Sequence, residues 1–482
     1  MHEGENWSDK ATDDLGGRKV FGRRSMTIAK HRRVSCRPLL IHGSLLCTLA
    51  MITVNGAQAE APSVPGKEIF FTPIEPLAKT IERSQSDPRP KTADGAFPIL
   101  DWLLYAGLGG GAACDYNLNS TPTNQQQACG PRFQPSIVAE RNTGIQRTLL
   151  YGVGDIRYYP TVSRVDVVDT TAGIVHVWEI QRDLIFRVQA QGTRGQEYSG
   201  FSANLLPTSV FLTSPVNYTQ GYGSTSIQKN LGSFFTAVGG SVTGTVYEDA
   251  RDNLGNTVDE QFRNGTVATL NGRFGYHISP IIYTFIEPSV NRQRYEASRL
   301  NSEGYRVVAG VGSDRISLFN GEFYAGYASQ RFDDPAIGSV SIPVVGGRLS
   351  WYPTRFLTFT LTADRTFSTS DFNTNGLAPG TVTNTGPGLL PGSATTATTA
   401  KLRADWDFTQ RFSFNASISD VHLDYLDSVR KDDLLSLVAG VTFKIKPDLG
   451  IQVNYIHQNL FTNIAGADYA RDFISVGAQS KF

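Results

Sequence analysis

The side chains of this sequence best suited to acid–base chemistry are two adjacent aspartates and a histidine with an aspartate close by. Asp333 and Asp334 are consecutive, and His422 precedes Asp424 by two positions. Carboxylates beside a His–Asp pair can activate water, which is the chemistry of a hydrolase. The same acids could instead be solvated loop residues or ligands for divalent cations. We keep a hydrolase as an alternative, but we predict no enzyme activity, no catalytic residue and no metal site.

A glycine-rich run from Gly107 to Gly111 superficially suggests a nucleotide-binding loop. The run lacks the following helix and lysine that hold phosphates in such a loop. Small residues also let a strand bend or let its neighbours approach closely, and we favour that explanation. The sequence holds no Gly-x-Ser-x-Gly motif, which argues against lipase chemistry. We therefore expect no cofactor.

Six basic residues occupy positions that we assign to the polar faces of predicted strands. They are Arg187, Arg273, Arg306, Arg348, Lys401 and Arg403. Basic side chains pair well with carboxylates and phosphates, so inside a barrel they would favour acidic solutes or an acidic polysaccharide. Alternatively, they brace the wall by pairing with acids such as Asp364, Asp405 and Asp407. The sequence leaves both interpretations open.

The overall charge is balanced, because Lys plus Arg and Asp plus Glu each total 44. No nucleic-acid partner is therefore expected. The mean hydropathy of −0.21 resembles that of a soluble protein. It does not exclude a transmembrane barrel, because only every second residue of a barrel strand faces lipid.

The amino-terminal segment combines basic residues, an apolar run at 39–54 and the triplet Ala57-Gln58-Ala59. This order predicts a Sec-type signal peptide that is cleaved between Ala59 and Glu60. A membrane anchor is the alternative, but the run is shorter than the ~20 residues that a spanning helix needs. Secretion through the inner membrane follows from this prediction.

The predicted organisation has three parts. Residues 1–59 are the signal peptide, and Met26 is an alternative start that would make residues 1–25 a mis-assigned extension. Residues 60–98 are rich in Pro, Ser, Lys and Glu without strong periodicity, and we expect a periplasmic lead-in segment there. Residues 99–482 form the remaining domain.

Signal cleavage would remove two of the four cysteines and leave Cys114 and Cys129. Two cysteines in an oxidising compartment, separated by a loop-like stretch, predict one disulfide. Closing such a loop is worth about 3 kcal/mol in the chain-entropy model. We expect this bond in the first external loop.

Short segments of alternating apolar and polar residues dominate the chain after residue 99, as expected of β-strands. Clear examples are 357–364, 401–408, 412–419, 435–446 and 449–458. No stretch after residue 60 reaches ~18 apolar residues, so no membrane-spanning helix is expected. These patterns predict an all-β protein.

The final segment, from Asp472 to Phe482, places Ile474, Val476 and Phe482 on one apolar side and small or polar residues on the other. An apolar face that ends on an aromatic final residue resembles the assembly signal of bacterial outer-membrane barrels. The resemblance implies that the barrel-assembly machinery recognises this strand.

Tight and long connections alternate along the predicted strands. Tight links fall near 142–144, 181–182, 239–240, 279–280, 313–314, 353–354, 410 and 447–448. Longer ones fall at 117–130, 160–170, 196–226, 249–260, 293–301, 332–339, 370–394, 425–431 and 462–467. Short periplasmic turns and longer external loops are typical of outer-membrane barrels. If residues 227–248 formed a single strand, every later connection would move to the opposite end of the barrel, so this pattern requires a turn at Gly239-Gly240.

Several stretches resemble the outer-membrane family called putative beta-barrel porin 2. They include Gly310-Val311-Gly312, the segment Gly321–Tyr327, the segment Arg348–Thr354 and Asp155–Tyr158. Members of this family are often associated with exopolysaccharide or capsule systems. The resemblance extends over most of residues 100–482 and implies an outer-membrane location.

The predicted fold is one transmembrane antiparallel up-and-down β-barrel of about 16–18 strands, with both termini periplasmic. We expect a porin-like passage or assembly component for exopolysaccharide or capsule export in a Gram-negative outer membrane. The alternatives are a general diffusion porin and a rim-active hydrolase. Expected partners are outer-membrane lipid, lipopolysaccharide, the barrel-assembly machinery, and polysaccharide or export-system proteins.

Overall fold

A computed structural model describes the chain over ten ranges: 96–118, 125–162, 166–197, 215–251, 254–316, 318–368, 395–426, 429–446, 448–463 and 468–481. All of them belong to the unit Ala50–Phe482. The predicted signal peptide, its cleavage site at Ala59 and Glu60, and Phe482 lie outside these ranges. So does all of the predicted lead-in segment except residues 96–98.

Eighteen antiparallel strands form a closed barrel, as predicted. They are β2 (Trp102–Tyr116), β3 (Gln127–Asn142), β4 (Gln146–Arg157), β5 (Val167–Gln181), β6 (Leu184–Glu197), β7 (Val216–Leu231), β8 (Phe234–Tyr247), β11 (Gly265–Ser279), β12 (Ile282–Tyr295), β13 (Ser302–Ile316), β14 (Phe319–Phe332), β15 (Ser339–Thr354), β16 (Leu357–Ser368), β17 (Thr395–Trp406), β18 (Phe412–Tyr425), β19 (Lys431–Lys446), β20 (Leu449–Thr462) and β21 (Tyr469–Lys481).

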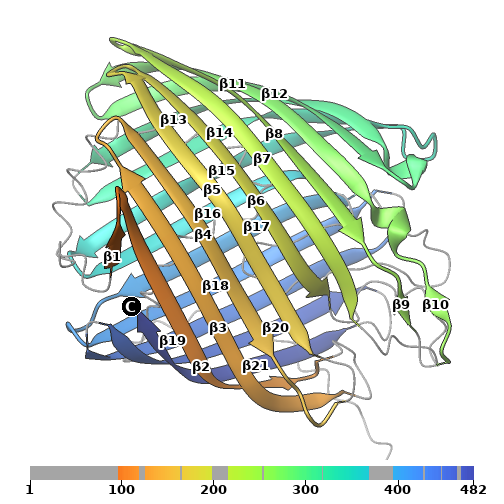
Figure 1. Ribbon diagram of the computed structural model, residues 1–482. Helices are drawn as coiled ribbons and strands as arrows, with labels where there is room; N and C mark the ends of the chain where they lie inside the picture. Colours follow the sequence, from red (N-terminus) through yellow and green to blue (C-terminus); the bar gives the residue numbers. More distant parts are fainter. Residues whose placement is uncertain are drawn as a thin grey trace, which may run out of the picture. The chain divides into compact units, whose positions relative to one another are not determined.

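Each barrel strand pairs with its neighbour in sequence, and β2 pairs with β21 from Gly107↔Lys481 to Tyr116↔Asp472. This last pairing closes the ring, so each of the eighteen barrel strands in the described ranges is paired along both edges. The strands run obliquely across the barrel wall (Figure 1). The short strand β1 (Ala96–Ile99) pairs with the start of β2, and β9 (Ala250–Arg251) pairs with β10 (Thr257–Val258) between β8 and β11.

Short and long connections alternate around the barrel. The short ones include 182–183, 232–233 and 280–281, and the long ones include 198–215 and 369–394. The alternation lapses at β18, where the connections on its two sides, 407–411 and 426–430, have the same length. Because β2 starts and β21 ends at the short-turn end, both ends of the barrel domain lie there. The opposite end is called the long-connection end below.

The predicted turn at Gly239-Gly240 is wrong. Both glycines lie within β8, and the turn is at residues 232–233, where Gly232 has a φ of +68°. The predicted connection 196–226 is correspondingly shorter, because β7 begins at Val216. Glycine is needed at the turn for its positive φ, whereas at position 240 its small size suits a close neighbour. A Cβ there would lie 3.3 Å from the Thr269 carbonyl oxygen.

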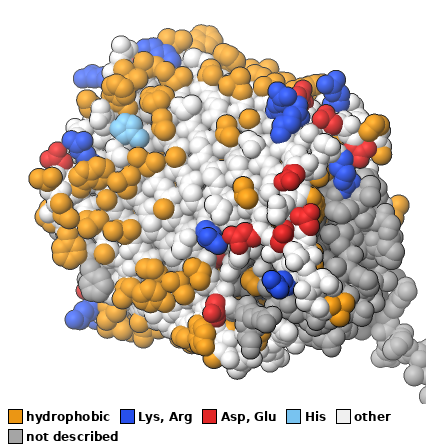
Figure 2. Space-filling view, turned by 45° about the vertical axis from the view of Figure 1, so that its right-hand side comes forward, with side chains coloured by type: hydrophobic (Ala, Val, Ile, Leu, Met, Phe, Trp, Pro, Cys, Tyr) orange, Lys and Arg blue, Asp and Glu red, His pale blue; other side chains and the backbone are white. Residues whose placement is uncertain are grey.

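Apolar side chains cover the outer face of the barrel because alternate residues of each strand point outward. Among them are Phe274, Val345 and Val476, with 53%, 63% and 48% of their surface exposed. In one view of the surface, hydrophobic side chains gather toward the left and charged ones toward the right (Figure 2). No helix in the described ranges is long and apolar enough to cross a membrane.

Outward aromatic side chains gather near the short turns. Trp351 stacks against Phe319 and Phe359, with ring centroids 6.1 and 5.3 Å apart. A second cluster contains Trp406 and Phe414, whose centroids are 5.7 Å apart. Such rings are typical of the level where a barrel leaves the hydrocarbon core.

Candidate functional site

The inner face of the barrel carries all six basic residues that the sequence analysis assigned to it. Facing pairs such as Ser289↔Arg306, Glu322↔Arg348 and Thr362↔Lys401 follow one another around the wall. Facing residues of paired strands share one side of a sheet, so this series defines the lumen side. Arg187, Arg273 and Arg403 fall on the same side through their partners Ser226, Ala237 and Thr360.

Arg273 is the centre of an ion-pair cluster on this face. Its Nη2 lies 2.6 Å from Glu287 Oε2, and its Nη1 and Nη2 donate to the two Glu322 oxygens at 2.9 and 3.0 Å. Tyr283 Oη donates to the same carboxylate at 3.0 Å. The guanidinium group also lies 4.0 Å above the Phe285 ring. The positive charge of Arg273 is therefore fully matched by acids.

Arg306 extends this cluster toward β16. Its Nη1 lies 3.7 Å from Glu287 Oε1, and its Nη2 lies 3.7 Å from Asp364 Oδ1. Tyr324 Oη donates to the same Asp364 oxygen at 2.5 Å. Like Arg273, Arg306 is buried, with 5% of its side chain exposed. These two residues brace the wall, which is one of the two roles considered from the sequence.

The other four basic residues are more accessible. Arg187, Arg348 and Arg403 are exposed on the lumen side, and Lys401 is half-buried. Arg403 binds Asp405 through two hydrogen bonds of 2.7 and 2.8 Å. In the described part of the chain, no ion pair involves Arg187, Arg348 or Lys401. These three side chains therefore present positive charge to the lumen without a described acid at ion-pair distance.

The acid partners were only partly foreseen. Asp364 and Asp405 pair with Arg306 and Arg403 as considered, whereas Glu287 and Glu322 were missed. The signal that could have revealed Glu287 is its position two residues before Ser289 on the lumen side. Two further ion pairs were also missed: Asp115 with Arg471, which joins β2 to β21 at the seam where the barrel closes, and Asp155 with Arg132, which joins β4 to β3.

The residues suited to a hydrolase are not brought together. Asp333 and Asp334 lie between β14 and β15, whereas His422 belongs to β18, so β15, β16 and β17 intervene. His422 Nδ1 lies 2.5 Å from Asp433 Oδ1, and its Nε2 lies 3.4 Å from Asp424. His422 also shares a face with Ile418, which is exposed on the outer wall. This arrangement does not form the acid–His site that the sequence left open.

The disulfide, the glycine run and the apolar side of the last strand, all predicted from the sequence, lie on β2 and the two strands that pair with it, β3 and β21. Cys114 in β2 and Cys129 in β3 face each other and form a disulfide, which joins the strand ends rather than lying within the loop. Gly107–Gly111 lies within β2, where a Cβ on Gly111 would meet the Val476 carbonyl oxygen. Ile474 and Val476 point outward from β21.

Comparison with known proteins gives a family and a fold class. The family model of putative beta-barrel porin 2 matches residues 99–482. No curated protein matches the chain by sequence.

Several solved structures resemble the chain. An iron transporter, FrpB from Neisseria meningitidis, has 10% identity and a TM-score of 0.42, covering 80% of this chain and 83% of its own. Pseudomonas aeruginosa OpdL has 12% identity and a TM-score of 0.40, covering 80% and 100%. The copper transporter OprC has 9% identity and a TM-score of 0.41, covering 82% of each chain. At these scores the likenesses carry no inference about cargo.

Proposed function

This chain belongs to the putative beta-barrel porin 2 family, and from that premise we propose that it is an outer-membrane passage for acidic polysaccharide in exopolysaccharide or capsule export. The protein is a porin-like outer-membrane β-barrel. In the proposed orientation the short turns and both termini are periplasmic, and the long connections face outward, as in other barrels of this class.

The observation that carries the proposal is the unneutralised positive charge on the lumen wall. Arg187, Arg348 and Lys401 face the lumen from β6, β15 and β17, and none forms an ion pair with another described residue. A low-dielectric wall with fixed charges of one sign concentrates counter-ions. Carboxylates of an acidic polysaccharide would interact with these groups as the chain passes, without a single tight site that stops movement.

The partners follow from this role. We expect a Sec-type signal peptide that is cleaved after Ala59, followed by insertion by the barrel-assembly machinery. The inserted barrel would contact outer-membrane lipid and lipopolysaccharide, and export-system proteins would dock at its short-turn end. The proposal includes no cofactor and no catalytic step. The ion pairs of Arg273 and Arg306 are structural in this role, because both side chains are buried.

The proposal is tested by polysaccharide block of single-channel current in planar bilayers. Acidic oligosaccharides added to one side should interrupt the current of the purified barrel, and neutral oligosaccharides of equal length should do so much less. A variant with Arg187, Arg348 and Lys401 all changed to Gln should lose this difference. Equal block by acidic and neutral oligosaccharides would favour a general diffusion porin, and a barrel without current would contradict a passage of either kind.

A further inference from the structure

The outer wall of the barrel carries a groove of about 1040 Å³ across β7, β8 and β11–β14. Its floor is made of small residues that point outward, including Gly223, Gly240 and Ala268. A Cβ on Gly223 would meet no atom within 4 Å, so the floor lies open at that point. Leu270 and Val290 form an apolar flank, with 57% and 52% of their surfaces exposed. The groove is thus a shallow apolar depression on the face that meets lipid.

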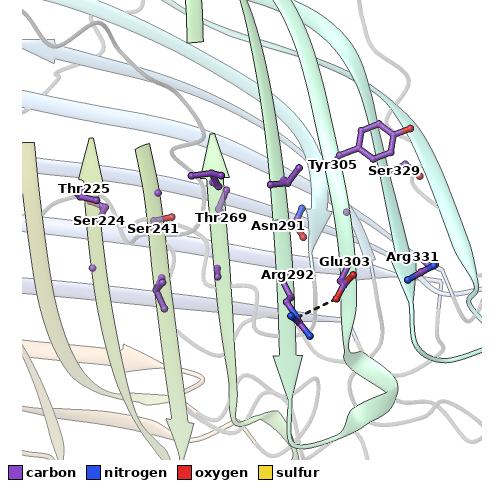
Figure 3. A pocket seen from close by; sticks show the side chains of 17 residues that line it. Ser224, Thr225, Ser241, Thr269, Asn291, Arg292, Glu303, Tyr305, Ser329 and Arg331 are labelled. Carbon is purple, nitrogen blue, oxygen red and sulfur yellow. Dashed lines mark ion pairs between the residues drawn. The ribbon is translucent and has the colours of Figure 1, made fainter. Parts of the chain in front are cut away.

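A row of charged side chains lies at the end of the groove nearest the long connections. Glu303 on β13 faces Arg292 on β12 and Arg331 on β14. Arg292 Nε lies 3.3 Å from Glu303 Oε1, and Arg294 Nη2 lies 2.6 Å from the same oxygen. Figure 3 shows Arg292, Glu303 and Arg331 on adjacent strands, with Tyr305 beside them.

The net charge of this row of side chains is positive. The row holds three arginines and one carboxylate, so it carries a net charge of about +2. The side chain of Arg292 is 64% exposed, and Arg331 is also exposed. In the described ranges Arg331 forms no ion pair. Arginine forks bind phosphate through two parallel hydrogen bonds, and arginine is therefore well suited to this ligand.

We propose that this groove binds a phosphorylated glycolipid of the outer leaflet, with the phosphate on Arg292 and Arg331 and an acyl chain on the floor around Gly223. Charge complementarity identifies the phosphate of the headgroup, and the apolar floor, which continues from Arg292 through Ala268 to Gly223 on neighbouring strands, identifies the chain. Basic pockets next to apolar walls recognise anionic lipid headgroups in this way. The choice of the outer leaflet rests on the proposed outward orientation of the long connections.

The test measures lipid bound to the purified full-length barrel in detergent by native mass spectrometry, so it depends on neither orientation nor transport. The probes are bis-phosphorylated lipid A, the same lipid without phosphates, and phosphatidylglycerol. The wild-type barrel should retain lipid A at least tenfold better than either other lipid, since each charged hydrogen bond lost costs about a factor of ten or more.

Three variants locate the site. R292Q/R331Q should reduce lipid A retention about tenfold or more, through loss of the phosphate contacts. Gly223→Leu should also reduce retention, because it fills the floor without touching the arginines. The matched control is Arg194→Gln, an exposed outer-wall arginine that pairs with Glu248 at 3.0 Å and does not line the groove. This control should bind lipid A as the wild type does. Heat-modifiable gel migration must show that every variant is folded.

Unchanged lipid A retention by folded R292Q/R331Q would overturn the inference. Equal retention of the dephosphorylated lipid would do the same. Equal retention of phosphatidylglycerol would overturn the assignment to a glycolipid. Dimers that dissociate in Gly223→Leu, without bound lipid in the wild type, would show that a second copy of the chain occupies the groove instead.

Discussion

Arg471 Nη2 lies 2.6 Å from Asp115 Oδ2, and this pair joins the last barrel strand to the first. A second bond, from Arg471 Nε to Asp115 Oδ1, measures 3.0 Å. Asp115 is fully buried and Arg471 is 5% exposed. The bidentate pair therefore fixes the register of β21 against β2, at the place where the barrel must close.

We predict that Asp115→Asn weakens the closed barrel by about 3–5 kcal/mol, because it leaves the charge of Arg471 buried without its carboxylate. Urea unfolding of the detergent-folded barrel, followed by intrinsic fluorescence, measures the change. Arg141→Gln is the control, since Arg141 pairs with Asp101 near the same seam but both are exposed. That control should change the free energy of unfolding by less than about 1 kcal/mol. Equal stability of the two variants would contradict a closing role for Asp115.

The second prediction concerns the glycine run in β2. Gly111→Val should reduce the folded fraction severely, because its Cβ would overlap the Val476 carbonyl oxygen across the seam. Gly110→Val, one residue away and pointing outward, should fold normally, because a Cβ there meets no atom within 4 Å. Comparing boiled and unboiled samples on gels gives the folded fraction. Similar folded fractions for the two variants would show that close approach at the seam does not require Gly111.

The third prediction is that secreted protein contains the Cys114–Cys129 disulfide. The two residues face each other on β2 and β3 with a Cα–Cα distance of 4.0 Å. Peptide mapping without reductant should recover the linked peptides. The double variant C114S/C129S should still insert, because the β2–β3 pairing from Leu103 to Tyr116 remains, but it should unfold at lower urea. Free thiols at both positions in wild-type protein would refute the pairing.

The fourth prediction concerns membrane assembly. Ile474 and Val476 point outward from β21, and the sequence pattern continues this apolar side to Phe482. Deletion of Phe482 should lower the amount of folded barrel in outer-membrane fractions, because we expect the barrel-assembly machinery to recognise this terminal aromatic residue. A barrel that is not assembled and closed leaves backbone groups unsatisfied in lipid. Lys481→Gln should have little effect. If the deletion leaves folded protein at wild-type levels, Phe482 is not part of the assembly signal.

The closed barrel could be predicted from the sequence because a period of two is a local property of each strand. Segments such as 435–446 alternate clearly enough to show which residues share a side. The assignment of Arg273 and Arg306 to a polar face used only this parity. Their acid partners depend on which strand positions face each other, and that register is not encoded in any short segment. Glu287 and Glu322 were missed for this reason.

Two other features depend on the geometry of the complete ring. Asp115 and Arg471 are 356 residues apart, and they meet only because the eighteenth strand returns to the first. The Gly239-Gly240 pair was misassigned as a turn because glycine suits both positive φ and close packing. The structure separates the two roles of glycine: Gly232 has a positive φ and forms the turn, whereas Gly239 and Gly240 do not and lie within β8.

The proposed passage requires a lumen that is open and that favours anions. The most direct measurement is the zero-current potential of the purified barrel in a planar bilayer with a salt gradient. We predict anion selectivity for the wild type and a shift toward cations when Arg187, Arg348 and Lys401 are changed to Gln. Changing Arg194 on the outer wall to Gln should leave the potential unchanged. A cation-selective wild type, or a triple variant with unchanged potential, would contradict the claim.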